Sequence, residues 1–307
     1  MRPVIDTPRP PELGLFGPES VTWRLSREIV VLVGGGARAL LLQVAHPKIA
    51  AAVADHSRYR ADPLGRLRDT LEAICIFTFE DTRKVDRVLR RVNGLHSRVF
   101  GETPEGEPYS ALDPDLLLWV YATLVDTPLL AYETFVQPLT PGERAAYYRE
   151  VRQVAGMWGI PPTHVPDSLG ALRAWMADLI ARGEVHVTPQ GRLIGRDLLE
   201  PPLWWLPPPS TLALRLVSLW LLPEALRSGF GYSWDPRRER FMRMVAATSR
   251  AVVPRLPRAL RDLPVARAAQ RRVQGVALQP DAAQQRRRSG SPGGPRGASS
   301  AGARDLR

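Results

Sequence analysis

The sequence is poor in the residues that build disulfides and most metal centres. Among its 307 residues there is one cysteine, Cys75, so the chain alone can form no internal disulfide and no thiolate cluster for zinc or iron–sulfur. Its five histidines follow none of the HxxxH, HExxH or two-histidine-one-carboxylate patterns, which leaves mononuclear zinc or non-haem iron without local support. The GxSxG motif of serine hydrolases is also missing, and Cys75 has no adjacent base. A buried core thiol is therefore its expected role.

The alternation of apolar and polar residues that marks β-strands is almost absent. Residues 184–194, EVHVTPQGRLI, are the one stretch that resembles a hairpin. Elsewhere apolar residues recur at helical spacing, and hydrophobic residues make up 44% of the chain, enough for a sizeable core. Helix-start signals occur at Asp62-Pro63, Asp113-Pro114 and Thr140-Pro141. We therefore expect an all-α fold with a single compact domain, followed by a helical or extended segment at 255–276.

The net charge of +11 is concentrated at one end of the chain. Residues 251–307 hold twelve arginines and three aspartates, a balance of +9, which leaves only +2 on the first 250 residues. The last part, residues 277–307, lacks aromatic residues and any apolar period, so we expect a disordered basic tail. Its RRR run could touch phosphates or an anionic membrane weakly, but a solvated tail is the favoured interpretation, and no specific nucleic-acid partner is expected.

The N-terminal segment, residues 1–13, is polar and rich in proline, and we expect a flexible arm there. No apolar stretch typical of a secretory signal is visible, and the single cysteine suits a reducing compartment. The expected location is the cytoplasm, with membrane association left open. One reason is the segment 210–222, which stands beside two tryptophans and could lie at a membrane interface, although a buried core helix is favoured.

Three consecutive glycines, Gly34 to Gly36, interrupt the apolar stretch at 29–45. They lack both the GxGxxG spacing and the GK[ST] ending of phosphate-binding loops, so close helix packing or close approach of a flat ligand is the better explanation. Arg38 and the glycines also argue for a core helix rather than a membrane span.

Residues 88–102, VLRRVNGLHSRVFGE, have the pattern of an amphipathic helix with a histidine on its apolar stripe. His96 lies one turn beyond Val92 on that face, and arginines occupy the other side. From this segment alone, a core histidine bonded to a carbonyl is favoured over a metal ligand.

A second unusual face lies about thirty residues upstream. Arg66 and Thr70 are four residues apart, so they share one helix face, which Ala73 and Phe77 continue with apolar atoms. A buried arginine there would need an anion from the protein or from a ligand. Taken alone, a salt bridge on the helix surface is the better explanation.

Several short motifs occur together in a characteristic order between about Gly14 and Pro254. They are LLLQVAHPKIAAAVADHSRYRADPLGRLRDTLEAICIFTF, VLRRVNGLHSRVFGE, YSALDPDLLLWVYATLVDTPLLAYETFVQPLTPGERAAYYREV, WGIPPTHVP and LLPEALRSGFGYSW. In this order they resemble the catalytic domain shared by MpaB-type oxygenases and the bacterial rubber oxygenase called latex clearing protein.

The resemblance implies an all-helical domain around a pocket for one non-covalent haem b. His96 then looks like the axial iron ligand, and Arg66 and Thr70 look like the arginine and threonine near the haem, with Arg66 facing a propionate. Phe77 is a candidate for the pocket wall. Trp119 and Tyr121 are further candidates for that wall, although each is more often a core residue at such spacing.

This chain also departs from the rubber oxygenase at three places. Asp69 stands where that enzyme can place a lysine on the far side of its iron, so the second axial position is expected to be open or held by water. Tyr121 replaces the histidine that is typical of a later motif. The stretch that supplies a glutamate base in that enzyme offers only Asp55 and His56, so cleavage of polyisoprene itself is not expected.

The expected function is therefore a haem-b-dependent oxygenase or oxidase that acts with O2 on an apolar small molecule, such as a prenyl or lipid-like compound, and takes electrons from an unidentified donor. The alternative is a non-catalytic helical protein that binds haem or lipid, since a fold alone does not establish an activity.

Overall fold

Two long helices form the centre of the fold. α2 (Ile29–Val44) and α6 (Pro114–Phe135) pack against each other, and their inward-facing side chains supply much of the main hydrophobic core. The computed structural model describes residues 14–57, 62–200 and 208–277, and nearly all regular structure in these ranges is helical. The predicted all-α single domain is confirmed. The expected arm at 1–13 and the expected tail, apart from Ala277, lie outside the described residues.

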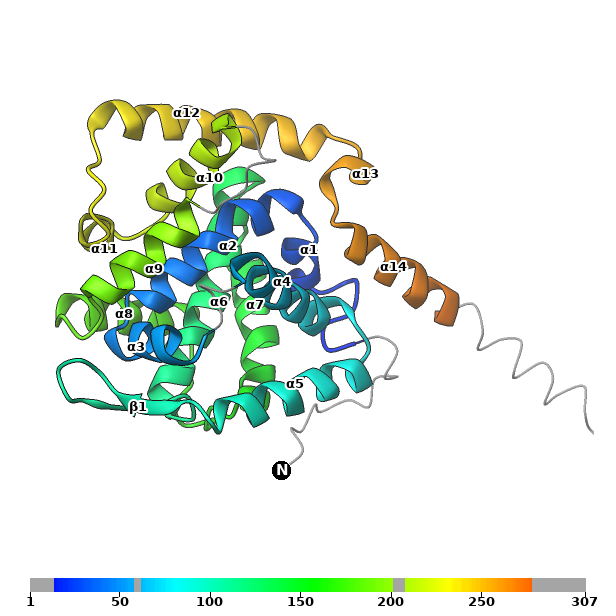
Figure 1. Cartoon of the computed structure of the whole chain (residues 1–307). Coiled ribbons are helices and arrows are strands. Elements are labelled where there is room, and N and C mark those ends of the chain that lie inside the picture. The colour runs from blue at the N-terminus through cyan, green and yellow to red at the C-terminus, as the bar shows by residue number, and fades with distance from the viewer. Residues whose placement is uncertain (1–13, 58–61, 201–207, 278–307) are drawn as a thin grey trace, which may run out of the picture.

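The other helices surround this central pair (Figure 1). They are α1 (Val21–Ser26), α3 (Pro47–His56), α4 (Pro63–Phe79), α5 (Thr82–His96), α7 (Pro141–Val154), η3 (Ala155–Trp158), α8 (Leu169–Ala181), α9 (Pro189–Leu199), α10 (Pro208–Trp220), α11 (Glu224–Gly229), α12 (Pro236–Val252), η4 (Val253–Arg255), α13 (Arg258–Arg261) and α14 (Pro264–Ala277). α12 lies along the top edge in Figure 1, and α14 descends at the right.

The glycine triplet lies inside α2 and allows the close approach of α6. A Cβ atom at Gly35 would lie 2.9 Å from the Thr127 methyl group and 3.3 Å from the Ala131 Cβ atom. The predicted role in close helix packing is therefore confirmed for this glycine. Within the described residues no single helix is both long and apolar enough to cross a bilayer. Taken together, α2 and α3 have the length and composition of a membrane span, but they are bent by 99° at the break between them.

The helix-start signals act as the sequence predicts. The Asp62 side chain accepts from the Gly65 N–H, the Asp113 side chain accepts from the N–H groups of the first turn of α6, and Thr140 forms a reciprocal capping box with Glu143. Each cap is followed by proline at the first helical position, where no backbone donor is lost.

Two expectations about local structure are wrong. The helix predicted at 88–102 ends at His96, and Phe100–Glu102 instead forms strand β1, paired antiparallel with β2 (Pro108–Ser110). The hairpin predicted at 184–194 does not form, because Thr188 caps α9 through the Gly191 N–H and Pro189 begins that helix. The 210–222 segment is helical to Trp220, and its C-terminal end is buried at Ser218 and Leu219.

The C-terminal segment docks on the domain through two crossed ion pairs. Arg27 donates to Asp262, with Nε 2.9 Å from Oδ1, and Arg261 donates to Glu28, with Nε 3.0 Å from Oε1. Both carboxylates are buried. α14 then covers the Trp23 and Phe79 rings with Ala266, Ala269 and Val273, which form a small second cluster with them. The segment expected at 255–276 is thus helical and attached to the domain at α1.

Candidate functional site

The predicted site residues lie on two neighbouring helices. α4 carries Arg66, Thr70 and Phe77, and α5 ends with His96. Glu80 and Asp81 join the two helices, which contact each other, and the Asp81 side chain caps α5 by accepting from the Lys84 N–H. Figure 1 shows both helices meeting at this turn on the right-hand side of the domain. The motif residues are therefore brought to one pair of packed helices.

His96 lies at the edge of the core rather than inside it. The buried part of the α5 stripe is formed by Val85 and Leu89, whereas Leu95 is 54% exposed and His96 is half-buried. The chain turns directly after the histidine, and the Val99 N–H donates to the His96 carbonyl at 3.0 Å. His96 is thus the last residue of α5, at the point where the chain leaves the helix.

Phe77 forms part of a rigid apolar wall. Its ring is buried and stacks on Trp158 of η3, with ring centroids 4.6 Å apart and an interplanar angle of 24°. η3 in turn contacts α5 and α6. Through this stack and these contacts, η3 connects the three helices that carry predicted residues, α4, α5 and α6.

Arg66 and Thr70, the predicted pair, lie one turn apart on α4. The structure gives the backbone of Arg66 in the first two turns of the helix, and the side chain of Arg66 is outside what it describes. Thr70 is half-buried one turn later. Asp69 is exposed, with Oδ1 3.7 Å from a guanidinium nitrogen of the neighbouring Arg68.

The acid and histidine noted upstream attach α3 to the β-hairpin. Asp55 accepts a 2.6 Å hydrogen bond from the Tyr109 hydroxyl, and His56 Nε2 lies 3.1 Å from the Phe100 carbonyl oxygen. Desolvation of the hydroxyl and the Asp55 carboxylate raise the pKa of Tyr109 to about 12. Asp55 therefore already has a hydrogen-bond partner in this structure.

Two polar groups have a buried atom without a hydrogen-bond partner among the described residues. One is Nδ1 of His46, a residue that the sequence did not single out for the site, and the other is the hydroxyl of Tyr121 on α6, a candidate for the pocket wall. Burial, and secondarily the charge of Lys48, lowers the pKa of His46 to about 4, so its imidazole is neutral at neutral pH. Its ring lies 6.4 Å from that of Trp119, whose Nε1 donates to the Leu42 carbonyl. Trp119 is therefore an interior residue.

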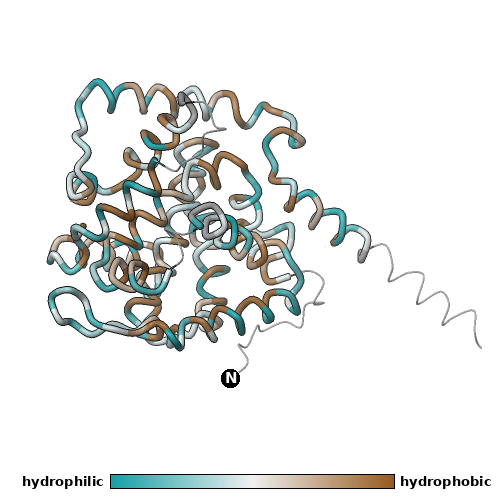
Figure 2. Tube along the Cα trace, viewed as in Figure 1, coloured by the Kyte–Doolittle hydropathy of each residue, from teal (hydrophilic) through white to brown (hydrophobic). Residues whose placement is uncertain are grey.

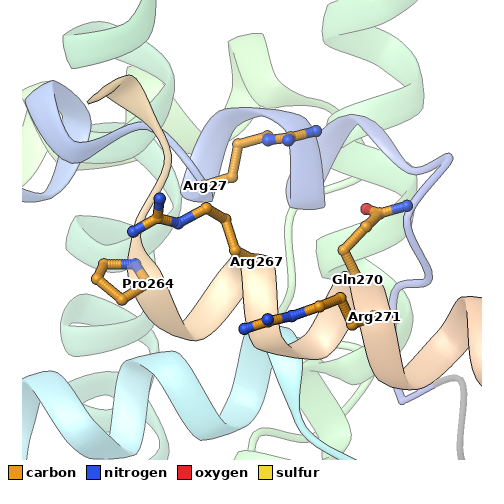
Figure 3. Close-up of a pocket in the computed structure, with 5 residues that line it drawn as sticks. All are labelled: Arg27, Pro264, Arg267, Gln270 and Arg271. Atoms are coloured by element: carbon orange, nitrogen blue, oxygen red, sulfur yellow. The ribbon is translucent and has the colours of Figure 1, made fainter. Parts of the chain in front are cut away.

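A groove of about 370 Å³ lies elsewhere on the molecule, beside α14 (Figure 3). It is lined by Arg27, Pro264, Arg267, Gln270 and Arg271. Figure 3 shows Arg267 and Arg271 extending from α14 and Arg27 reaching in from the opposite side. Among the described side chains, none that was predicted for the site lines this groove. The groove is basic: Arg27 pairs with Asp262, and Arg267 and Arg271 add two further positive charges.

Comparison with known families identifies the central part of the chain. Residues 23–251 match the family described as "ER-bound oxygenase mpaB/B'/Rubber oxygenase, catalytic domain". The match contains all four predicted site residues and ends before α13 and α14. No curated protein and no solved structure matches the chain. Because the match covers well over half of the sequence, the chain belongs to the mpaB and rubber oxygenase catalytic-domain family.

Proposed function

We propose that this member of an oxygenase family binds haem b between α4 and α5 and oxidises an apolar small molecule with O2. The family match, which includes both helices, carries the proposal. When bound, haem would supply the reaction with O2, and the protein would supply a nitrogen donor, orientation and an apolar environment.

The residues present suit such a group. One ring nitrogen is enough to hold a haem iron from the protein side, and we assign this role to His96, which is half-buried at the end of α5. The Phe77–Trp158 stack places apolar rings on α4 and on η3, which contacts α5. A carboxylate-bearing ligand also needs a cation, and Arg66 is the residue of α4 that we assign to this role.

Each residue has a distinct task in this proposal. His96 donates a lone pair from a ring nitrogen. Arg66 binds a propionate carboxylate through its guanidinium N–H groups, and Thr70 offers its hydroxyl as a hydrogen-bond donor one turn away. Phe77 keeps water out of the space beside the porphyrin.

The test is haem retention by the purified full chain. After reconstitution with haemin and desalting, the wild type should keep a Soret band that is lost or strongly shifted in His96→Ala. His46→Ala is the matched control, because it removes another imidazole from the same domain. A wild type that takes up no haemin contradicts the proposal. Loss of the Soret band in His46→Ala alone would show that His46, and not His96, binds the iron.

The arginine is tested in the same assay. Arg66→Ala should weaken haem retention by roughly 1.5 to 3 kcal/mol, the size of a charge-assisted pair. Arg68→Ala removes an equal charge from an exposed position of α4 and should leave retention unchanged. Equal haem loss from the two variants would place Arg66 on the surface, away from the ligand.

Turnover separates an oxygenase from a haem carrier. The reduced, haem-loaded protein should consume O2 faster when prenyl or fatty-acyl compounds are added, and His96→Ala should not. Stable haem binding without such stimulation would favour the non-catalytic alternative, in which the same pocket holds haem or lipid without a reaction.

A further inference from the structure

α12 has two apolar faces, and only one of them is covered. Met242 and Ala246 are buried against the domain, where the helix contacts α6 and α10. Phe241 and Met244 point elsewhere and are 50% and 58% exposed. Figure 1 shows α12 along the outer edge of the molecule, and Figure 2 shows hydrophobic and hydrophilic residues alternating along it.

Three large apolar residues are exposed on one side of α12. At 100° per residue, Phe241, Met244 and Val252 fall within about 80° of one another around the helix, on a different side from the buried Met242 and Ala246. We call Phe241, Met244 and Val252 the α12 stripe. Each is about half exposed, so this side of the helix presents apolar surface to the surroundings.

The same region is strongly basic. Residues 236–260 contain seven arginines and one glutamate, a net charge of +6. The helical positions of Arg237 and Arg240 place them on and beside the stripe. The glutamate, Glu239, lies on the other side of the helix and accepts hydrogen bonds from Trp220, Trp234 and Arg243. An apolar stripe flanked by arginines and free of carboxylates is the pattern of a helix that lies in a membrane interface.

From this pattern we propose that the α12 stripe docks the protein on an anionic lipid surface. The apolar side chains enter the boundary between headgroups and acyl chains, and the arginines bind lipid phosphates and carboxylates. This inference is independent of the haem chemistry proposed above, since it concerns a different face and different residues.

Charge complementarity decides against the other occupants. A second copy of the chain that docked through the same face would bring the same +6 charge against it. The parts of the chain outside the described residues also offer no acidic complement: residues 1–13 and 201–207 have no net charge, residues 58–61 carry +2 and residues 278–307 carry +4. A negatively charged membrane satisfies both the apolar and the basic parts of the surface.

Vesicle binding tests the proposal. The full chain is sedimented with vesicles of phosphatidylcholine alone and with vesicles of equal parts phosphatidylcholine and phosphatidylserine. The wild type should partition to the phosphatidylserine vesicles, and added salt should weaken this binding. The double variant Phe241→Ser/Met244→Ser should bind at least about tenfold more weakly, equal to about 1.4 kcal/mol.

Charge variants test whether vesicle binding depends on the arginines of α12 or on the positive charge of the whole protein. Arg237→Gln/Arg240→Gln removes two charges at the stripe and should reduce binding several-fold. Arg267→Gln/Arg271→Gln removes the same charge from the α14 groove and should bind within about twofold of the wild type. An equal loss in both double variants would overturn the assignment to α12.

Further outcomes also count against the proposal. It fails if the wild type does not bind anionic vesicles, or if Phe241→Ser/Met244→Ser binds as the wild type does. Light scattering that finds a dimer split by this variant would make the stripe a subunit interface instead. Because all of these side chains are exposed, the variants should keep the wild-type thermal transition. Val252→Ser, near the end of α12, repeats the test at a third position of the stripe.

Discussion

Arg38 of α2 and Asp126 of α6 form an ion pair in the interior, with Nη2 2.7 Å from Oδ2 and side chains only 5% and 8% exposed. Arg38 also donates from Nη1 to the Thr127 hydroxyl and from Nε to the Leu221 carbonyl, while Asp126 Oδ1 accepts from Arg173 of α8. Burial alone would raise the pKa of Asp126, but the two guanidinium groups outweigh it and hold that pKa below its usual value. The cluster ties α2, α6, α8 and the end of α10 together.

Asp126→Ala should therefore lower the free energy of unfolding by about 3 to 5 kcal/mol, because it leaves the Arg38 charge buried and unpaired. Arg173→Gln is the matched control. It removes the cation that is 39% exposed and should cost no more than about 1 kcal/mol. Urea unfolding of both variants measures the difference, and a larger effect for Arg173→Gln would show that the interior pair is not the stabilising element.

Alanine substitutions at two neighbouring glycines of the triplet should change the stability of the fold in opposite directions. Gly35→Ala should destabilise the fold by roughly 1 kcal/mol or more, because the new methyl group would overlap the Thr127 methyl of α6 and force the two central helices apart. Gly36→Ala should stabilise it by up to about 1 kcal/mol, since no atom lies within 4 Å of a Cβ there and alanine favours the helix. Thermal melts of the two variants that shift in the same direction would contradict this packing.

Local signals in the sequence were sufficient for much of the fold. The caps at Asp62, Asp113 and Thr140 predicted helix starts because a side-chain oxygen there satisfies N–H groups only a few residues away. The start of α9 carried the same signal in Thr188-Pro189, which the hairpin interpretation overlooked. The end of α5 was not predictable in this way, because β1 exists only through its pairing with β2.

The candidate site could also be predicted from the sequence only in part. The helical spacing of Thr70 and Phe77, and the motif around His96, could be found in the sequence. The stacking of Phe77 on Trp158 depends on how η3 packs against α5 and α6, and no local pattern encodes it. The unpartnered polar atoms of His46 and Tyr121 are likewise a result of tertiary burial.

His46 should make the stability of the protein depend on pH in the acid range. Its pKa in the folded protein, about 4, lies below the ordinary value of 6.5, so the unfolded chain binds the proton more tightly. Stability is then fully present above pH 6.5 and is lost as the pH falls toward 4, by up to about 3 kcal/mol.

Unfolding by urea at a series of pH values checks this prediction. His46→Gln should remove most of the loss between pH 6.5 and 4 that this residue causes. His164→Gln, which replaces an exposed loop histidine, should retain the slope of the wild type. An unchanged slope in His46→Gln would show that the imidazole is not held neutral by burial.

Tyr121 and Tyr147 provide the last prediction, because they are both buried but differ in their hydroxyl groups. The Tyr121 hydroxyl has no partner among the described residues, whereas the Tyr147 hydroxyl donates to the Val125 carbonyl at 2.7 Å. A buried polar group without a hydrogen bond costs about 1 to 3 kcal/mol, and a satisfied one contributes about 1 kcal/mol. Tyr121→Phe should therefore stabilise the haem-free protein by roughly 1 kcal/mol, and Tyr147→Phe should destabilise it by a similar amount. Thermal melts of the two variants measure both effects, and a Tyr121→Phe variant that melts below the wild type would mean that this hydroxyl has a stabilising partner in solution.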